Sequence, residues 1–304
     1  MTVDASRTGC LPLAPGVYRF RDAAGRVLYV GRAVSLRRRV ASYGGDLGDR
    51  RHLAVMVARI ARVEAVPCDS AHEAAWLERN LLQRRLPPWN RSPSGGQEAE
   101  VWIRLSASAR APGLTVVHQP GPPDGATRYF GPYLGGQKVR DAVSGLGRVL
   151  PLAYAADAAA GTARDLARVR GAAPGARAAL AGALTAVLNR DPAAVTSLQA
   201  ELTARRDAAA AALAFEFAGR LQAELEALAW IAGEQKVTQA LPCDLDVHGW
   251  ADGMRVSFEI RGGRLTGWRQ RPCAAAAARR YLAQSPPEWA AFARRAAELA
   301  ARLR

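Results

Sequence analysis

The pattern of apolar and polar positions predicts a β-hairpin near the N-terminus. Val, Tyr, Phe and Leu are concentrated at residues 16–21 and again at 27–31, on either side of a turn-prone stretch at 22–26. If Asp22 pairs with Val27, the register of the two strands is fixed over their whole length.

This register places two tyrosines on one face of the hairpin. Phe20 faces Tyr29 and Tyr18 faces Gly31, so that Tyr18 and Tyr29 become diagonal neighbours about 7–8 Å apart. The glycine opposite Tyr18 leaves room for a backbone or a ligand to approach closely. A pair of aromatic residues that only stabilises the hairpin is the alternative interpretation at this point.

Helical periodicity follows the hairpin. Leu36, Val40 and Tyr43 recur on one face of a helix that begins after Ser35, which can cap it, and runs to about Tyr43. The apolar face predicts that this helix packs on the hairpin.

Four arginines accompany this helix. On a helical wheel Arg37 and Arg38 point to solvent, where we expect them to meet DNA, whereas Arg39 lies at the edge of the buried face and points back to the hairpin. Arg32, in the loop expected after Gly31, adds a second cation. A guanidinium held in this way offers a fork of donors that suits a phosphate.

A glutamate interrupts the apolar stripe of a second helix. Residues 70–85 read as a helix with Ser70 as its cap and Glu73 at the third position. Glu78 falls among the stripe residues Ala74, Leu77, Leu81 and Leu82. A carboxylate there is costly unless it is paired or binds a cation, so two explanations stay open: an ion pair with Arg39, or a ligand of a hard divalent cation.

Composition favours a polyanionic partner. The formal net charge is +15 and the sequence pI is about 10.8, and binding to such a partner weakens steeply with salt. Four cysteines lack the spacing of a zinc site. Because no signal pattern and no apolar run of about 18 residues is present, we expect a soluble cytoplasmic protein without membrane contact.

The remaining chain reads as alternating β-rich and helical segments. We expect strands near 101–118 and 128–133, helices near 136–149, 176–189 and 192–232, a β-rich piece at 243–270 and a terminal helix at 286–304. The fold class is therefore α+β. The predicted divisions are 12–92, 98–190, 192–232 and 240–304.

The first division resembles a known nuclease family. The motifs Gly16-Val17-Tyr18, Tyr29-Val30-Gly31-Arg32-Ala33, Leu36, Arg39, Ser42-Tyr43, Glu73-Ala74, Leu77-Glu78, Asn80-Leu81 and Pro88-Trp89-Asn90 look like a GIY-YIG nuclease domain of the UvrC type. Such a domain is a small α/β fold, a hairpin-based antiparallel sheet with flanking helices.

The resemblance implies roles for individual residues. Glu78 would hold a magnesium or manganese ion. Arg39 and Arg32 would neutralise charge on the phosphate, and Tyr43 would hydrogen-bond to it. The general base is left open between Tyr29 and Tyr18, which otherwise positions the water. If Tyr29 is the base, either nearby cations favour its phenolate or a neighbouring group accepts its proton. Asn90 would orient the site from just outside.

Resemblance to the same family continues beyond the nuclease domain. Residues 129–133, 139–140 and 151–152 resemble the segment that follows it, and 243–268 resembles the stretch before the family's second, RNase H-like nuclease. Residues 198–230 look like the helical hairpin that contacts UvrB. The partner-binding residues expected there are Leu213, Phe215, Glu216 and Leu221.

Two departures from the family change the expectation. The four-cysteine cluster appears as Ala155, Ala163, Gly171 and Gly175, so no iron–sulfur cluster is expected there. The chain stops at Arg304, without length for the RNase H-like nuclease or a helix-hairpin-helix module. This architecture is similar to the short, Cho-like form of the family, which makes one cut.

The leading functional hypothesis is a metal-dependent DNA endonuclease that cuts damaged double-stranded DNA once in nucleotide excision repair, recruited by a UvrB-like helicase. Two alternatives stay open. One is a non-catalytic DNA-binding adaptor, and the other is a stand-alone structure-specific nuclease outside excision repair.

Overall fold

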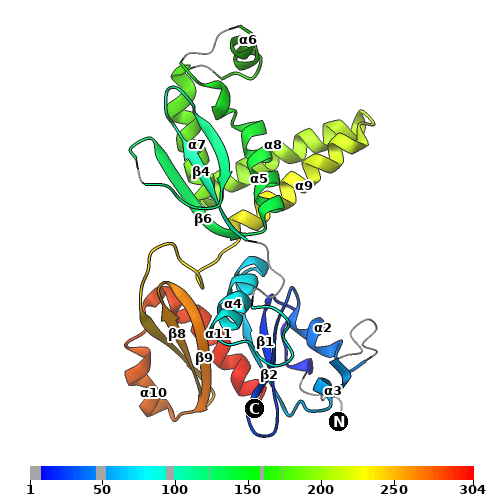
Figure 1. Ribbon diagram of the computed structural model, residues 1–304, viewed down its shortest axis with the longest axis vertical. Helices are drawn as coiled ribbons and strands as arrows, with labels where there is room; N and C mark the ends of the chain where they lie inside the picture. The colour runs from blue at the N-terminus through cyan, green and yellow to red at the C-terminus, as the bar shows by residue number, and fades with distance from the viewer. Residues whose placement is uncertain (1–7, 46–52, 94–98, 123, 158–160, 173) are drawn as a thin grey trace. The chain divides into compact units, whose positions relative to one another are not determined.

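The computed structural model describes residues 8–45, 53–93, 99–122, 124–157, 161–172 and 174–304 (Figure 1). The chain forms two compact units, one made of residues 1–97 and 234–304 and the other of residues 98–233. Both combine antiparallel sheets with helices, which agrees with the predicted α+β class. No helix within the described ranges is both long and apolar enough to cross a bilayer.

A three-stranded sheet forms the core of the first unit. β1 (Gly16–Arg21) lies in the centre, between β2 (Val27–Ala33) and β3 (Arg62–Pro67), and all pairings are antiparallel. Because β2 pairs only with β1, it is an edge strand whose outer backbone groups need other partners.

The hairpin register is confirmed in its centre and wrong next to the turn. The two central pairs are Tyr18 with Gly31 and Phe20 with Tyr29. A bulge then brings Arg21, in place of Asp22, opposite Val27. Asp22 instead closes the turn, because its backbone N–H donates to the Arg26 carbonyl at 3.0 Å.

Three helices accompany this sheet: α2 (Leu36–Ala41), α3 (Ala54–Val57) and α4 (Ala71–Arg84). The α2 helix is shorter than expected, so Tyr43 lies in the turn that follows it. Ser35 occupies the N-cap position, but its hydroxyl is buried and makes no cap hydrogen bond, contrary to expectation.

The structure contains one of the two hydrogen bonds of the capping box expected at the start of α4. The Ser70 hydroxyl accepts the Glu73 N–H at 3.0 Å, as a capping box requires. The Glu73 carboxylate, however, accepts the backbone N–H of Asp69 at 2.7 Å and that of Lys236 at 2.9 Å. A residue from the C-terminal part of the chain therefore completes the start of α4.

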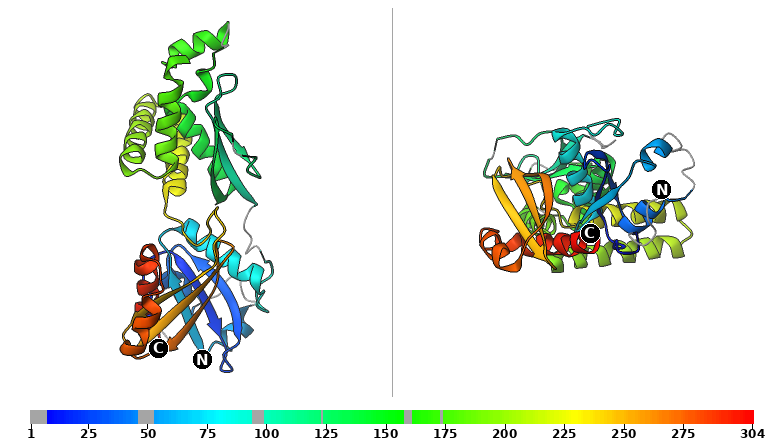
Figure 2. Two further views of the ribbon diagram at one scale, coloured as in Figure 1. Left: turned by 90° about the vertical axis from the view of Figure 1, so that its left-hand side faces the viewer. Right: turned by 90° about the horizontal axis from the view of Figure 1, so that it is seen from below.

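The C-terminal part of this unit is a second sheet with two helices (Figures 1 and 2). Its strands β7 (Leu245–Ala251), β8 (Met254–Arg261) and β9 (Arg264–Pro272) follow in sequence order, before α10 (Ala275–Leu282) and α11 (Pro287–Arg302). The α11 helix packs on β7, on β8 and also on β3. Residues 240–304 thus share one compact unit with the N-terminal domain.

The second unit contains the strands β4 (Glu100–Ser106), β5 (Gly113–Val117) and β6 (Thr127–Leu134), in the order β5-β4-β6. The helices are α5 (Gly136–Val149), α6 (Thr162–Val169), α7 (Arg177–Leu188), α8 (Pro192–Ala211) and α9 (Phe215–Ala232). α8 and α9 lie side by side as a helical hairpin joined at residues 212–214 (Figure 1).

Candidate active site

A cleft of ≈ 560 Å³ opens between β2, α2 and the first half of α4. Its polar lining includes Tyr29, Arg32, Ser35, Arg38, Arg39 and Glu78. The strand β2 contacts both α2 and α4, and its Tyr29 side packs against α2. All three elements therefore contribute side chains to the same cleft.

The carboxylate of Glu78 lies in this cleft and is only 5% exposed. Its Oε2 accepts a hydrogen bond from Arg32 Nε at 3.0 Å. An ion pair, one of the two explanations for Glu78, is therefore present, with Arg32 as a partner. Arg32 lies within β2 and not in a loop after it, which fixes its guanidinium against α4.

Of the tyrosines, Tyr29 is the one that lines the cleft. Tyr18 and Tyr43 are 0% and 1% exposed, and their hydroxyls hydrogen-bond to each other at 2.9 Å behind it. The rings of Tyr18 and Tyr29 are on one face, with centroids 6.2 Å apart. Tyr18 and Tyr43 thus lie behind the residues that line the cleft, and the roles expected for them, at the water and at the phosphate, stay predictions.

The space above Gly31 belongs to these tyrosines and not to a ligand. A Cβ added at Gly31 would lie 2.6 Å from the Tyr18 hydroxyl and 2.7 Å from the Tyr29 ring. Both distances are far inside van der Waals contact, so only glycine permits the two rings to pack over β2.

The three arginines of α2 have different surroundings. Arg39 points to the hairpin as expected: its Nε donates to the Tyr18 hydroxyl at 3.3 Å and its guanidinium lies 5.6 Å from the Tyr43 ring centroid. Arg38 is exposed and lines the cleft. Arg37 is exposed too, but its Nε donates to the Leu11 carbonyl at 2.7 Å, away from the cleft lining.

Asn90 fastens the edge strand from outside the cleft. Its Oδ1 accepts the Val30 N–H at 3.0 Å and its Nδ2 donates to the Val30 carbonyl at 2.8 Å. This side chain replaces a neighbouring strand at the outer edge of β2, between Tyr29 and Arg32. Asn90 therefore positions two cleft residues without lining the cleft itself.

Burial raises the pKa of both Tyr29 and Tyr18. Burial raises the pKa of Tyr29, the neighbouring Tyr43 raises it further, and Arg39 only partly opposes the change. Burial likewise raises the pKa of Tyr18 well above its usual value. Arg39 therefore favours the Tyr29 phenolate, as expected of a nearby cation, but burial and Tyr43 outweigh it in the protein without a bound metal.

The opposite side of α4 is held by residues 234–238, a contact that sequence reasoning missed. Ser70 donates its hydroxyl to the Glu234 carbonyl at 2.5 Å. Asn80 donates to the Val237 carbonyl at 3.2 Å and to the Thr238 hydroxyl at 2.9 Å. In the sequence, this contact is indicated by Asn80, a polar residue in a stretch of helix that is expected to be buried. This segment fixes the helix that carries Glu78.

The donor set suits a hard divalent cation held by few protein ligands. The described residues contain no group of three or more His, Cys, Asp or Glu side chains that could form a cage. Glu78 instead offers one nearly buried carboxylate to a cleft lined by arginines. Magnesium is commonly bound by one or two carboxylates, with water and substrate phosphate completing its shell.

The residues expected at a partner surface divide into two groups. Leu213 and Phe215 are 72% and 67% exposed at the tip of the α8–α9 hairpin, and Glu216 is exposed beside them. Leu221, in contrast, is 0% exposed within the apolar core of its unit. Leu221 therefore stabilises the hairpin and is not available to a partner.

Comparison with known proteins connects this geometry to one family. Residues 14–91 match the family described as the UvrC-like GIY-YIG domain. UvrABC system protein C of Geobacter metallireducens is 39% identical over 152 residues, which cover 50% of this chain and 24% of that protein.

Two other relatives of the same name extend the match along the chain. The protein of Mycolicibacterium paratuberculosis is 32% identical over 280 residues, covering 86% of this chain and 42% of the relative. That of Chlorobaculum tepidum is 31% identical over 287 residues, covering 87% and 45%. The chain thus spans less than half the length of these relatives.

Proposed function

Because residues 14–91 are a UvrC-like GIY-YIG domain and the chain is homologous to UvrABC system protein C over most of its length, we propose that it is a metal-dependent DNA endonuclease of nucleotide excision repair. In this proposal it makes a single incision in damaged duplex DNA. The observation that carries the proposal is the cleft in which Glu78, Arg32, Arg39 and Tyr29 meet.

The residues of the cleft divide the reaction between them. Arg39 and Arg32 bind the scissile phosphate and stabilise the charge that develops on it; losing one such donor typically costs on the order of 100- to 1,000-fold in rate. A magnesium or manganese ion bound by Glu78 would supply Lewis-acid polarisation of the phosphate and stabilise the leaving oxygen.

Proton transfer is assigned to Tyr29, because this tyrosine lines the cleft and Tyr18 does not. The deprotonated form of Tyr29 accepts the proton of the attacking water as the water oxygen bonds to phosphorus, and the P–O3′ bond breaks with its electron pair on the leaving 3′ oxygen. Tyr18 and Tyr43 act from behind, where Tyr18 holds the Arg39 guanidinium.

We assign the recruitment of this nuclease to the tip of the α8–α9 hairpin. Leu213 and Phe215 expose large apolar side chains there, with Glu216 next to them, and neighbouring apolar and aromatic side chains can anchor a protein interface. The occupant in this proposal is a UvrB-like helicase. A stand-alone nuclease would cut without that partner.

The test is incision of a lesion-bearing duplex with magnesium, with and without UvrB. We expect cutting to require UvrB and to be lost in Glu78→Ala. Phe215→Asp should reduce the cutting that depends on UvrB. Retained cutting by Glu78→Ala would eliminate the assignment of the metal ligand. Binding of DNA without any cutting by the intact chain would favour the adaptor hypothesis.

A further inference from the structure

The C-terminal sheet has one face that α11 does not cover. Along β8, Met254, Val256, Phe258 and Ile260 are buried, and Phe258 packs on Phe292 of α11 with ring centroids 5.3 Å apart. The alternating residues point to the other side, because successive side chains of a strand face opposite ways. This second face is called the outer face here.

Two arginines lie directly opposite each other at one end of the outer face. Arg255 of β8 pairs in register with Arg271 of β9. Like charges in directly opposed positions destabilise a sheet. Neither arginine forms an ion pair with any described residue, so the sheet itself does not compensate this charge.

The α10 helix brings a third arginine and an aromatic ring to the same place. Arg280 Nη2 donates to the Tyr281 hydroxyl at 2.9 Å, and the Arg255 guanidinium lies 3.7 Å from the Tyr281 ring centroid. Hydrogen bonds from Arg255 and Arg280 lower the pKa of Tyr281. Trp250 of β7 is the register partner of Arg255 and adds a second aromatic side chain.

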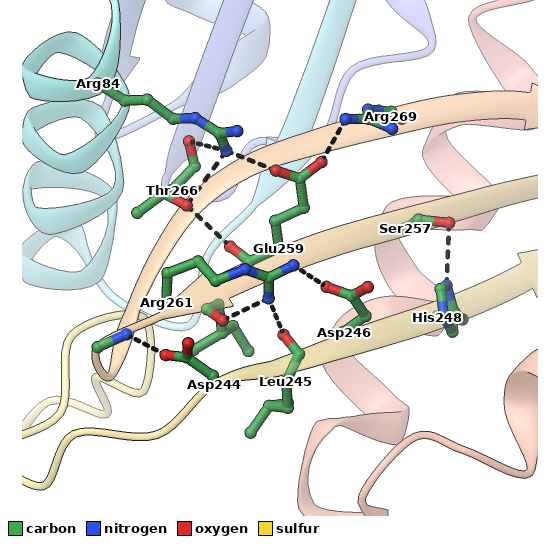
Figure 3. Close-up of polar contacts among 12 residues, drawn as sticks. Arg84, Asp244, Leu245, Asp246, His248, Ser257, Glu259, Arg261, Thr266 and Arg269 are labelled. Carbon is green, nitrogen blue, oxygen red and sulfur yellow. Dashed lines mark hydrogen bonds and ion pairs between the residues drawn. The ribbon is translucent and has the colours of Figure 1, made fainter.

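The acidic residues of the outer face lie at its other end and are already neutralised (Figure 3). Glu259 is bound by Arg84 at 2.5 Å and by Arg269 at 2.7 Å. Asp246 is bound by Arg261 at 2.8 Å. These acidic residues are therefore not available to neutralise the arginines at the opposite end of the outer face.

The nearest described acidic residue along the chain forms no ion pair with these arginines. Asp252, in the turn between β7 and β8, lines a hollow together with Trp250 and with Arg294, Glu298 and Arg302 of α11. The three arginines at positions 255, 271 and 280 thus form a cationic cluster that is flanked by Trp250 and Tyr281. We name these five residues the outer-face cluster.

We propose that the outer-face cluster binds the sugar–phosphate backbone of duplex DNA at a distance from the cleft. Three guanidinium groups without acidic partners complement closely spaced phosphates, and such contacts position a protein on DNA without reading its sequence. This inference rests on the proposed function, since it supplies a second DNA contact within the unit that contains the cleft.

The test measures DNA binding separately from DNA cutting. In a Glu78→Ala background without divalent ions, the affinity for a labelled undamaged 30-base-pair duplex is followed by fluorescence anisotropy at several salt concentrations. Arg271→Gln/Arg280→Gln is the test variant, because both side chains are exposed and their loss leaves the core intact. Arg59→Gln/Arg85→Gln, also exposed and outside both the cluster and the cleft lining, is the control of equal charge.

We expect the test variant to bind more weakly and to reduce the magnitude of the negative slope of log K against log salt by about 1.8, since each of the two lost phosphate contacts removes about 0.9. The control should keep the parent slope. Equal slopes for both variants would overturn the inference even if the intact enzyme cuts DNA. A parent that does not bind duplex at all would overturn this inference, whereas incision in the presence of UvrB tests the proposed function separately.

Discussion

Arg32 Nε lies 3.0 Å from Oε2 of Glu78 and joins the edge strand of the hairpin to the middle of α4. The same carboxylate is the ligand that we propose for a divalent cation. The guanidinium and the cation therefore compete for one side chain, while both attract the phosphate of the substrate. This relationship makes the roles of the two residues separable by experiment.

Replacing Arg32 with Gln is expected to tighten metal binding while it slows incision. Loss of the positive charge removes a repulsion on the incoming cation, which we expect to lower the apparent Kd for Mn²⁺ roughly three- to tenfold. The phosphate at the same time loses a donor. Isothermal titration of the DNA-free protein and incision assays measure the two effects.

Glu78→Gln provides the matched control, since it keeps the size of the side chain and removes its charge. It should abolish Mn²⁺ binding in the same titration. If Arg32→Gln instead weakens binding of the metal, Arg32 orients Glu78 for the cation and does not compete with the cation for this carboxylate.

Tyr29→Phe should mainly change the incision rate, whereas Tyr18→Phe should mainly change the stability of the fold. Tyr29 lines the cleft, so its loss is expected to reduce the incision rate on the order of 100-fold or more. Tyr18 hydrogen-bonds to Tyr43 behind the cleft, so its loss should mainly reduce stability, by about 1 kcal/mol. Single-turnover incision and urea unfolding distinguish them, and the reverse pattern would transfer the role of base to Tyr18.

The raised pKa of Tyr29 predicts the pH dependence of the reaction. A base must be deprotonated to act, and below its pKa the phenolate fraction grows about tenfold per pH unit. We therefore expect incision to accelerate from neutral to alkaline pH, and the residual activity of Tyr29→Phe to respond much less. A rate independent of pH above 7 in the parent would argue against this assignment.

The buried carboxylate of Glu64 should be important for stability. It pairs with Arg19 and, at 3.0 Å, with Arg21, on the side of β1 opposite Tyr18. Burial lowers the pKa of Arg19 to about 10, so this cation depends on its partner. Breaking a buried pair by removing one member costs about 3–5 kcal/mol. Equilibrium urea unfolding of Glu64→Gln measures the loss.

The same pair predicts a dependence of stability on pH. Burial alone would raise the pKa of Glu64, but Arg19 and Arg21 outweigh it and lower the pKa below its usual value. A lowered pKa stabilises the fold above the pKa of the unfolded chain, and this contribution is lost as pH falls through the folded pKa. The parent should thus lose more stability below pH 4.5 than Glu64→Gln does. Parallel curves would disprove the linkage.

Asn90→Asp isolates one of two hydrogen bonds. An ionised aspartate still accepts the Val30 N–H but cannot donate to the Val30 carbonyl, which Asn90 Nδ2 reaches at 2.8 Å. We expect a loss of about 1–3 kcal/mol and reduced incision, because β2 carries Tyr29 and Arg32. Hydrogen exchange at the amides of β2 should accelerate locally. Asn90→Ala, which loses both bonds, should have the larger effect.

Local patterns were sufficient for the hairpin, for α4 and for the burial of Glu78. The alternation that placed Tyr18 opposite Gly31 depends on a period of two, and the stripe around Glu78 on a period of 3.6. The bulge beside Arg21 was beyond such reasoning, because it changes the register without changing the alternation at the centre of the strands.

Contacts between distant segments were not accessible in the same way. Nothing local in the sequence joins Arg19 to Trp268, yet the guanidinium lies 3.9 Å from that ring centroid and donates to the Trp268 carbonyl at 3.0 Å. The same holds for Asn80 and residues 237–238. These contacts cross more than 150 positions of the chain, so periodicity carries no information about them.

The sequence by itself indicated the candidate side chains, since a carboxylate in an apolar stripe, a tyrosine pair and an arginine at a helix edge are each recognisable from spacing. Tertiary structure alone decided which groups share the cleft. It paired Glu78 with Arg32, buried Tyr18 and Tyr43 behind Tyr29, and held α4 against the C-terminal segment. The physical reason is that spacing fixes the face of an element on which a residue lies, whereas packing of whole elements fixes what that face meets.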